Sequence, residues 1–344
     1  MTATPDAPSR TGTSAPEVPV RADGVHLIGE LPGSGYKQPP SLVRRADGQT
    51  VQLTRLLFLV LDSIDGRRSL DDVADRVSDG FGRLVSAAQV GELVDGQLRP
   101  LGLLRLADGS EPPVRKANPL LNVRLKKVVT DPAVTRKVTA PFAVLFHPFV
   151  VIPFVLAFTV TAGWVLFREG LAAAAHDAFT EPGLFLLVFA LTALSAGFHE
   201  FGHAAACRYG GATPGAMGAG LYLVWPAFYT EVGDSYRLGR GGRVRVDLGG
   251  LYFNALFAVA MFGVWALTHW QALLLIIAAQ VLQMLRQLAP LVRFDGYHIL
   301  ADLTGVPDLY SHIRPTLAGL LPHRWRRPSA LTWWARAVVT VWVL

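Results

Sequence analysis

The stretch His199-Glu200-Phe201-Gly202-His203 decides how the rest of this 344-residue chain is interpreted. Two histidines four residues apart stack on one face of a helix, where both imidazoles can bind a single zinc ion. Glu200 directly follows the first histidine, so it is placed to act as a general base on a water bound to the metal. We expect this motif to hold one Zn²⁺ per chain.

The residues around the motif are unusually apolar for a metalloprotease. Residues 183–198 carry no charged side chain, whereas a soluble protease helix would be amphipathic. This helix is therefore expected to lie in lipid or to be buried in protein. A final apolar run, 331–344, holds 14 residues and is short for a span. We expect four or five spans in all, beginning with residues 144–167, 183–207, 249–270 and 272–290.

Positive charge gathers just before the first expected span and in later loops, and it accounts for the net charge of +6. Cytoplasmic loops of membrane proteins carry their lysines and arginines in this way. The charge therefore indicates orientation in a bilayer, and no nucleic-acid partner is expected. Residues 1–24 lack the apolar core of a signal peptide. We expect a multi-pass protein of the cell (inner, cytoplasmic) membrane, with its N-terminus and its metal site toward the cytoplasm.

Composition divides the chain into five parts. A disordered tail is expected at 1–37, because these residues are rich in Thr, Ala, Pro, Ser and Gly and have little to bury. The following parts should be a small cytoplasmic α+β domain at 38–107 and a basic linker at 108–143. The remaining parts are a membrane core at 144–310 and a segment at 311–344 that ends in the start of a further apolar helix.

Helix-start signals organise residues 38–107. Thr54, Ser69 and Ser86 can each cap a helix, and Gln89 completes a capping box with Ser86. The three helices should end near Asp65, Gly80 and Leu98, and short strands are expected at 51–53 and 101–106. This winged-helix-like order resembles the small PqqD-like modules that grip leader peptides in ribosomally made peptide pathways. The resemblance implies peptide recognition; a scaffold that packs beside the membrane core is an equally weighted alternative.

A zinc site made by two histidines needs a third protein ligand, and Asp295 is the candidate. It follows the fourth expected span, at the same cytoplasmic depth as His203. Pro290 and Gly296 should break the helix around Asp295 and let the carboxylate turn toward the metal.

Taken together, these motifs resemble the site-2 protease family of intramembrane zinc metalloproteases, and more narrowly its bacterial peptide zinc metalloprotease branch. The resemblance is carried by the zinc motif at 199–203, by Asp295-Gly296 and by the glycine-rich span that contains Asn254. It implies a polytopic α-helical membrane fold and hydrolysis of a peptide bond. It also places Asn254 near the active site, where its amide would stabilise an oxyanion or hold the substrate backbone. The alternative for Asn254 is a hydrogen bond between helices of the bundle. Gln287 departs from the family, which has Asn there.

Two further features suggest substrate contacts. Gln283 and Gln287 share one face of the fourth span with Gln280, and they should either bind an unwound substrate or pack against neighbouring helices. Residues 217–229 are apolar, too short to span and interrupted by Pro226, so we expect a re-entrant extended segment. Its free edge would hold the substrate by β-addition, and the alternative is a loop on the membrane surface. The residues proposed for this contact are Leu221, Leu223 and Trp225.

The function expected from these residues is intramembrane hydrolysis of a peptide or of a membrane-anchored protein segment, with maturation of a ribosomally made precursor peptide as one form of it. The partners would be that substrate, the lipid bilayer and proteins of peptide biosynthesis or export. Two alternatives are a catalytically silent scaffold for peptide export and a metal transporter. The intact Glu200 argues against the first, and ligands that converge at one depth argue against the second.

Overall fold

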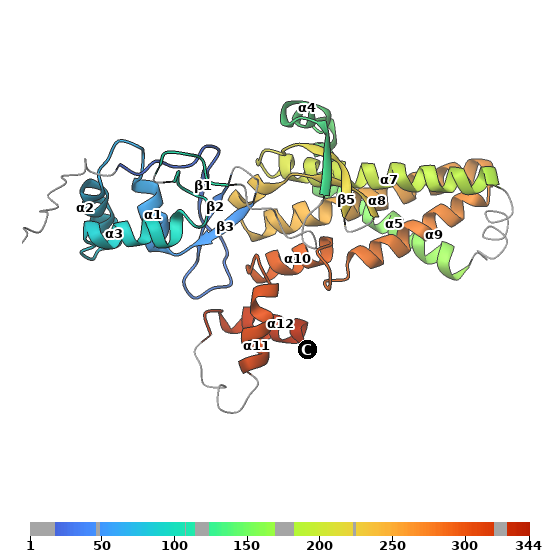
Figure 1. Cartoon of the computed structure of the whole chain (residues 1–344). Helices are drawn as coiled ribbons and strands as arrows, with labels where there is room; N and C mark the ends of the chain where they lie inside the picture. The colour runs from blue at the N-terminus through green and yellow to red at the C-terminus, as the bar shows by residue number, and fades with distance from the viewer. Residues whose placement is uncertain are drawn as a thin grey trace, which may run out of the picture. The chain divides into compact units, whose positions relative to one another are not determined.

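The computed structural model describes residues 18–45, 49–106, 108–113, 124–168, 182–222, 225–319 and 329–344 (Figure 1). The chain divides into two compact units. Unit 1 comprises Met1–Glu30 and Pro40–Lys116, and unit 2 comprises Leu31–Pro39 and Ala117–Leu344.

Unit 1 contains a three-stranded antiparallel sheet in the order β1 (His26–Glu30), β2 (Ser41–Arg44) and β3 (Thr50–Leu53). The expected strand at 51–53 is confirmed by β3. The expected tail is wrong for the described residues from 18 onward, because β1 lies there and pairs with β2.

The strand expected at 101–106 is also wrong. Within that stretch Leu104 makes only an isolated bridge with Arg21. Leu103 and Leu104 are both fully buried, whereas successive residues of a strand would point to opposite faces.

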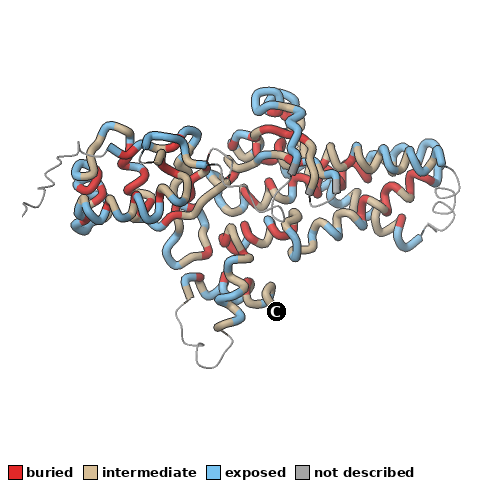
Figure 2. The backbone as a smooth tube through the Cα atoms, in the orientation of Figure 1, coloured by how far each residue is buried: buried red, intermediate tan, exposed pale blue. Residues whose placement is uncertain are grey.

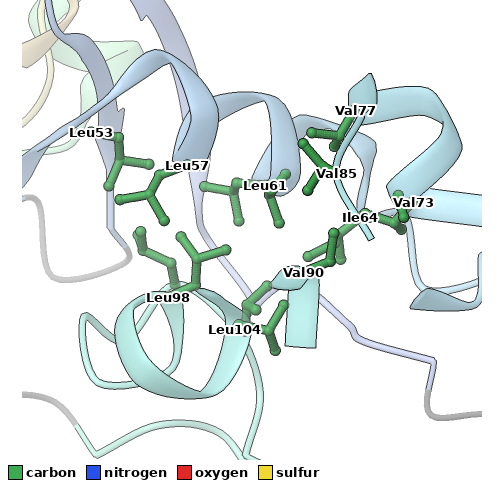
Figure 3. Close-up of a cluster of buried hydrophobic side chains, with 14 of the residues drawn as sticks. Leu53, Leu57, Leu61, Ile64, Val73, Val77, Val85, Val90, Leu98 and Leu104 are labelled. Atoms are coloured by element: carbon green, nitrogen blue, oxygen red, sulfur yellow. The ribbon is translucent and has the colours of Figure 1, made fainter. Parts of the chain in front are cut away.

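The helices of unit 1 begin where their caps predict. Thr54 caps α1 (Arg55–Ser63), and capping boxes start α2 (Leu70–Phe81) and α3 (Ala87–Leu93), which a π-helical turn, η1 (Val94–Leu98), continues. Helix α2 ends at Gly82 rather than at Gly80, because Gly82 adopts the left-handed conformation (φ 74°) that terminates a helix. Side chains from α1 to η1 converge on one apolar core, in which Leu61, Ile64 and Leu98 are fully buried (Figure 3).

Unit 2 is built on long apolar helices. Among the described residues, three helices are long and apolar enough to cross a membrane: α5 (Pro148–Phe167), α7 (Pro182–Tyr209) and α8 (Arg240–Thr268). Helix α9 (Ala272–Gln287) is apolar but has only 16 residues, and the expected final span is the 11-residue α12 (Trp333–Val343). The described part of the chain is thus mostly helical and fits a membrane protein, with three candidate spans where the sequence predicts four or five.

Helix α8 is the centre of this bundle. It packs against α5, α7, α9 and α10 (Asp295–Thr304), and every residue from Gly249 to Ala258 is buried. Large apolar residues of α5 and α7, such as Phe149 and Phe189, are instead exposed. Exposed positions recur along the backbone of both helices (Figure 2). Apolar surface of this extent on a long helix fits contact with lipid.

A second antiparallel sheet lies in unit 2, in the order β4 (Arg124–Thr130), β5 (Met217–Tyr222) and β6 (Trp225–Thr230). The extended conformation expected for 217–229 is confirmed by the β5–β6 hairpin. The expected linker at 108–143 is wrong in its described C-terminal part. There β4 pairs with β5, and α4 (Pro132–Val138) and the 3-10 helix η2 (Pro141–Phe146) follow.

The remaining short elements of unit 2 are η3 (Gly233–Arg237), η4 (Tyr310–His312) and α11 (Ile313–Gly319). The segment Leu31–Pro39, which connects β1 to β2 along the chain, also belongs to unit 2. Gly35 bonds through its backbone to Gly305, at the end of α10, and to Thr332, before α12.

One buried arginine, Arg243, joins the segment Leu31–Pro39 to helices α8 and α10. Arg243 of α8 is fully buried, pairs with Asp302 of α10 at 2.8 Å and donates to the carbonyl of Pro32 at 3.0 Å. The start of α8, the end of α10 and the segment Leu31–Pro39 are therefore fastened together.

Candidate metal centre and active site

Helix α7 carries His199 and His203 on the face that packs against α8. The two helices approach closely because a glycine of each faces the other. A Cβ added to Gly202 would lie 2.6 Å from the carbonyl carbon of Gly249, and a Cβ added to Gly249 would lie 2.5 Å from the carbonyl oxygen of Gly202. No side chain fits at either position, so this glycine pair sets the distance between α8 and the two histidines.

Gly250, the next residue of α8, leaves room for the imidazoles. A Cβ at this position would lie 2.5 Å from Nε2 of His203 and nearer still to Nε2 of His199. The space into which both Nε2 atoms point therefore exists because residue 250 has no side chain.

Asp295 is the first residue of α10 and reaches the same space from the other side. Its Oδ2 lies 3.1 Å from Nε2 of His199, and its Oδ1 lies 3.6 Å from Nε2 of His203. A Cβ on Gly296 would meet the backbone of Leu288, so glycine lets the start of α10 fold back onto the end of α9. Burial by itself would raise the pKa of Asp295, but the nearby His203 and His199 outweigh it and hold that pKa below its ordinary value.

The spacing of these three groups fits a metal ion. The two Nε2 atoms are 3.0 Å apart, which with the two carboxylate distances gives separations of 3.0, 3.1 and 3.6 Å. Ligands about 2.0–2.1 Å from a tetrahedral zinc ion are about 3.3 Å from one another. Asp295 Oδ2 is also buried without a hydrogen-bond partner. A cation would satisfy this atom and the converging nitrogens together.

The orientation of His203 is fixed by the backbone. Its Nδ1 lies 2.8 Å from the carbonyl oxygen of Val246, which can only accept, so Nδ1 carries the proton and donates. In the neutral ring Nε2 of His203 is then the unprotonated nitrogen, and it lies 3.0 Å from Nε2 of His199 and 3.6 Å from Oδ1 of Asp295. This is the tautomer that a metal ligand needs.

A chain of buried polar side chains surrounds His199. The amide nitrogen of Asn254, on α8, lies 3.1 Å from Nδ1 of His199 and 3.1 Å from Oε1 of Gln287. Ser195 donates to Oε1 of Gln280 at 2.8 Å and lies 3.4 Å from Oδ1 of Asn254. The structure thus brings Asn254 and Gln287 to the metal centre, but Gln283 has no place in this chain of hydrogen bonds.

Glu200 lies beside the two histidines. One of its carboxylate oxygens and one ring nitrogen of each histidine lie within 4.8 Å of one another. Its backbone carbonyl accepts a hydrogen bond of 3.1 Å from the hydroxyl of Thr230, the last residue of β6. The hairpin is therefore attached to α7 at the glutamate itself.

The structure changes which strand offers a free edge. Leu221 lies on β5, the central strand, and pairs with Arg124 on one side and Pro226 on the other. The expectation that a substrate adds at Leu221 is therefore wrong, because its backbone is already paired on both sides. Trp225 lies on β6, which among the described strands pairs with β5 alone. Leu223 lies outside the described residues.

Several residues of the site escape prediction from the sequence. The carbonyl of Val246 has no signature, since any residue supplies one. Thr230 and Ser195 are common residue types whose partners are 30 and 59 positions away in the sequence. Only Gly249-Gly250 offered a usable signal, a glycine pair in a helix where glycine is unfavourable unless close packing requires it.

No family model matches the chain, and no solved structure matches it with significance. A curated protein of Bacillus subtilis (strain 168), named "Putative peptide zinc metalloprotease protein YydH", is 25% identical over 199 residues. The match covers 57% of this chain and 76% of that protein. This similarity and the spacing of the site support a relationship to zinc metalloproteases, with zinc as the corresponding metal.

Proposed function

We propose that this protein is an intramembrane zinc metalloprotease of the site-2 type, and that it hydrolyses a peptide bond of a peptide or of a membrane-anchored segment. The observation that carries the proposal is the convergence of His199, His203 and Asp295 at the spacing of zinc ligands, with Glu200 beside them, inside an apolar helical bundle. The similarity to a protein named as a zinc metalloprotease supports it.

His199, His203 and Asp295 would hold the metal, and Glu200 would handle the proton. Bound Zn²⁺ polarises a carbonyl and lowers the pKa of water toward neutrality. The Glu200 carboxylate is close enough to take a proton from the attacking water and to return it to the departing amine. In a transporter the ligands would be spread along a path, whereas here they meet at one point.

The outer edge of β6 is the best candidate for holding the substrate. A protease binds its substrate extended, and a free strand edge does this through backbone hydrogen bonds. Strand β6 ends at Thr230, which is bonded to the backbone of Glu200. A peptide added beside β6 would therefore run toward the general base.

The wider setting belongs to the same proposal. The protein would be a multi-pass protein of the cytoplasmic membrane, with α9 as an additional short span and with its N-terminus and active site toward the cytoplasm. Unit 1 would bind the substrate peptide in the manner of PqqD-like modules, and a ribosomally made precursor is the substrate class that suits this role. Proteins of peptide biosynthesis or export would then be its partners.

Glu200→Gln tests the reaction. The full chain, purified in detergent and loaded with Zn²⁺, is incubated with a library of fluorogenic peptides, and bound zinc is measured separately. Hydrolysis should fall by roughly 10²–10⁴-fold while one zinc ion per chain stays bound, because a general base contributes about this much. Glu231→Gln, an exposed glutamate just after β6, is the matched control. Cleavage that survives Glu200→Gln, or a wild-type protein that binds no zinc, would contradict the proposal.

A further inference from the structure

The buried polar chain around His199 bears on which ring nitrogen of this histidine carries the proton. A histidine binds a metal through an unprotonated nitrogen, so His199 must carry its proton on Nδ1 if Nε2 is to bind. The only side chain bonded to Nδ1 is, within the described part of the protein, the amide of Asn254. The amide presents either its oxygen or its nitrogen to the ring, and these two orientations are nearly identical in shape.

In one orientation the Asn254 nitrogen donates to Nδ1. The proton of His199 is then on Nε2, where it points at the unprotonated Nε2 of His203, 3.0 Å away, and toward Asp295. In this arrangement Nε2 of His199 is protonated, so His199 cannot bind a metal through it.

In the other orientation the Asn254 oxygen accepts from Nδ1–H, and the neighbours determine whether it is tolerated. The amide nitrogen then faces the hydroxyl oxygen of Ser195, 3.4 Å away, which can accept because Ser195 itself donates to Gln280. Gln287 turns its own amide so that its nitrogen donates to the Asn254 oxygen at the 3.1 Å separation observed. The donors of His199, Asn254, Ser195 and Gln287 that face one another in this chain then each meet an acceptor, while the amide nitrogen of Gln280 stays buried without a partner.

We propose that Asn254, set by Ser195 and Gln287, is a positioning residue that holds the proton of His199 on Nδ1 and so makes Nε2 a zinc ligand. The inference rests on the proposed function, because it concerns the same metal site. It assigns Asn254 to the histidine rather than to an oxyanion. Asn254 is fully buried and its amide is already bonded to His199 and Gln287, which leaves it poorly placed to contact a substrate.

Zinc affinity of the full chain in detergent, measured by competition with a chelator, tests the proposal. Asn254→Leu removes the acceptor at similar volume and should weaken zinc binding by about 10- to 100-fold, as loss of a group behind a metal ligand does. Asn254→Asp keeps an oxygen toward Nδ1–H and should stay within about threefold of wild type. Thr192→Val, one turn before Ser195 on α7, removes a hydroxyl bonded within its own helix and should change nothing.

Several outcomes would overturn the proposal. They are wild-type affinity in Asn254→Leu, or an affinity in Asn254→Asp as poor as in Asn254→Leu. A third is a metal-free Asn254→Leu protein whose loss of thermal stability is as large, in free energy, as its loss of zinc affinity, because Asn254 would then contribute to packing alone. If Asn254→Leu does not fold, Ser195→Ala and Gln287→Leu give the test. Each should lower affinity by about 3- to 10-fold, and wild-type affinity in both would overturn it.

The same measurements separate this inference from the proposed function. If the wild-type chain binds no zinc, or if His199→Ala binds it as well as wild type does, the metalloprotease proposal fails. If the wild type binds zinc and His199→Ala does not, only the role of Asn254 is in question.

Discussion

Gly250→Ala is the most direct test of how the helices make the metal site. The added methyl carbon would lie 2.5 Å from Nε2 of His203 and nearer to Nε2 of His199, whereas an unstrained contact is about 3.5 Å. Either the methyl group takes the place of the metal, or the two imidazoles move by about 1 Å, and metal–ligand distances tolerate only ~0.2 Å. Loss of a group behind a ligand lowers metal affinity by about 10- to 100-fold, and displacing the ligands themselves should lower zinc affinity by at least as much.

The assay is chelator competition on the full chain, with thermal unfolding of the metal-free protein alongside it. Gly263→Ala is the matched control, because it lies on the same helix and its added Cβ would have nothing within 4 Å. That variant should bind zinc as the wild type does. A Gly250→Ala protein that holds one zinc ion per chain with wild-type affinity would refute the assignment of the space beside Gly250 to the metal.

Three further perturbations have defined outcomes. Asp295→Ala should lower zinc affinity by more than ~100-fold, because a ligand matters more than the groups behind it; an unchanged zinc content would remove Asp295 from the site. Leu61→Ala should destabilise unit 1 by about 2–5 kcal/mol, read by hydrogen exchange of its helices, and Leu84→Ala, at a position 92% exposed, should leave exchange unchanged. Burial lowers the pKa of His312 below its ordinary 6.5. Below pH 6.5 the unfolded chain therefore binds more protons than the folded chain, and acid should reduce stability. The drop in thermal midpoint from about pH 7 to 5 should be smaller in His312→Gln, and an equal drop in that variant would contradict this.

Local signals predicted local structure well. The capping boxes at Ser69 and Ser86 fix where two helices of unit 1 begin, because their hydrogen bonds join residues three apart. The apolar spans were found for the same reason, since a charge-free run of about 20 residues needs no partner to be recognised. The residues that converge at the candidate metal centre are also predicted, because two of them lie one helical turn apart.

Long-range pairing could not be found in this way. The sequence predicts a basic linker where β4 lies, and in the structure side chains of this strand are exposed, as with Leu125 at 78% and Val129 at 70%. Its strand conformation comes from hydrogen bonds to β5, some ninety residues later in the chain. Strand β1 was missed for the same reason, since its conformation depends on pairing with β2.

Hydrogen-bond partners within the site could not be predicted from the sequence either. The sequence identifies Asn254 as a polar residue in an apolar helix, but it does not say which neighbour its amide meets. That depends on how α7, α8 and α9 pack, and hence on the contact between Gly202 and Gly249. Roles that depend on a bond between helices therefore become visible only in the structure.

The segment Leu31–Pro39 has a consequence for the genetic dissection of this protein. Residues 31–39 belong to unit 2, and so do the residues from 117 onward. Most of unit 1, residues 40–116, is therefore an insertion in the sequence of unit 2 and not a separate N-terminal domain. A truncation that begins near residue 117 would remove the carbonyl of Pro32, one of the two carbonyls to which Nη1 of the buried Arg243 donates. The informative experiment is an internal deletion of residues 40–116 that rejoins Pro39 to the chain through a flexible linker.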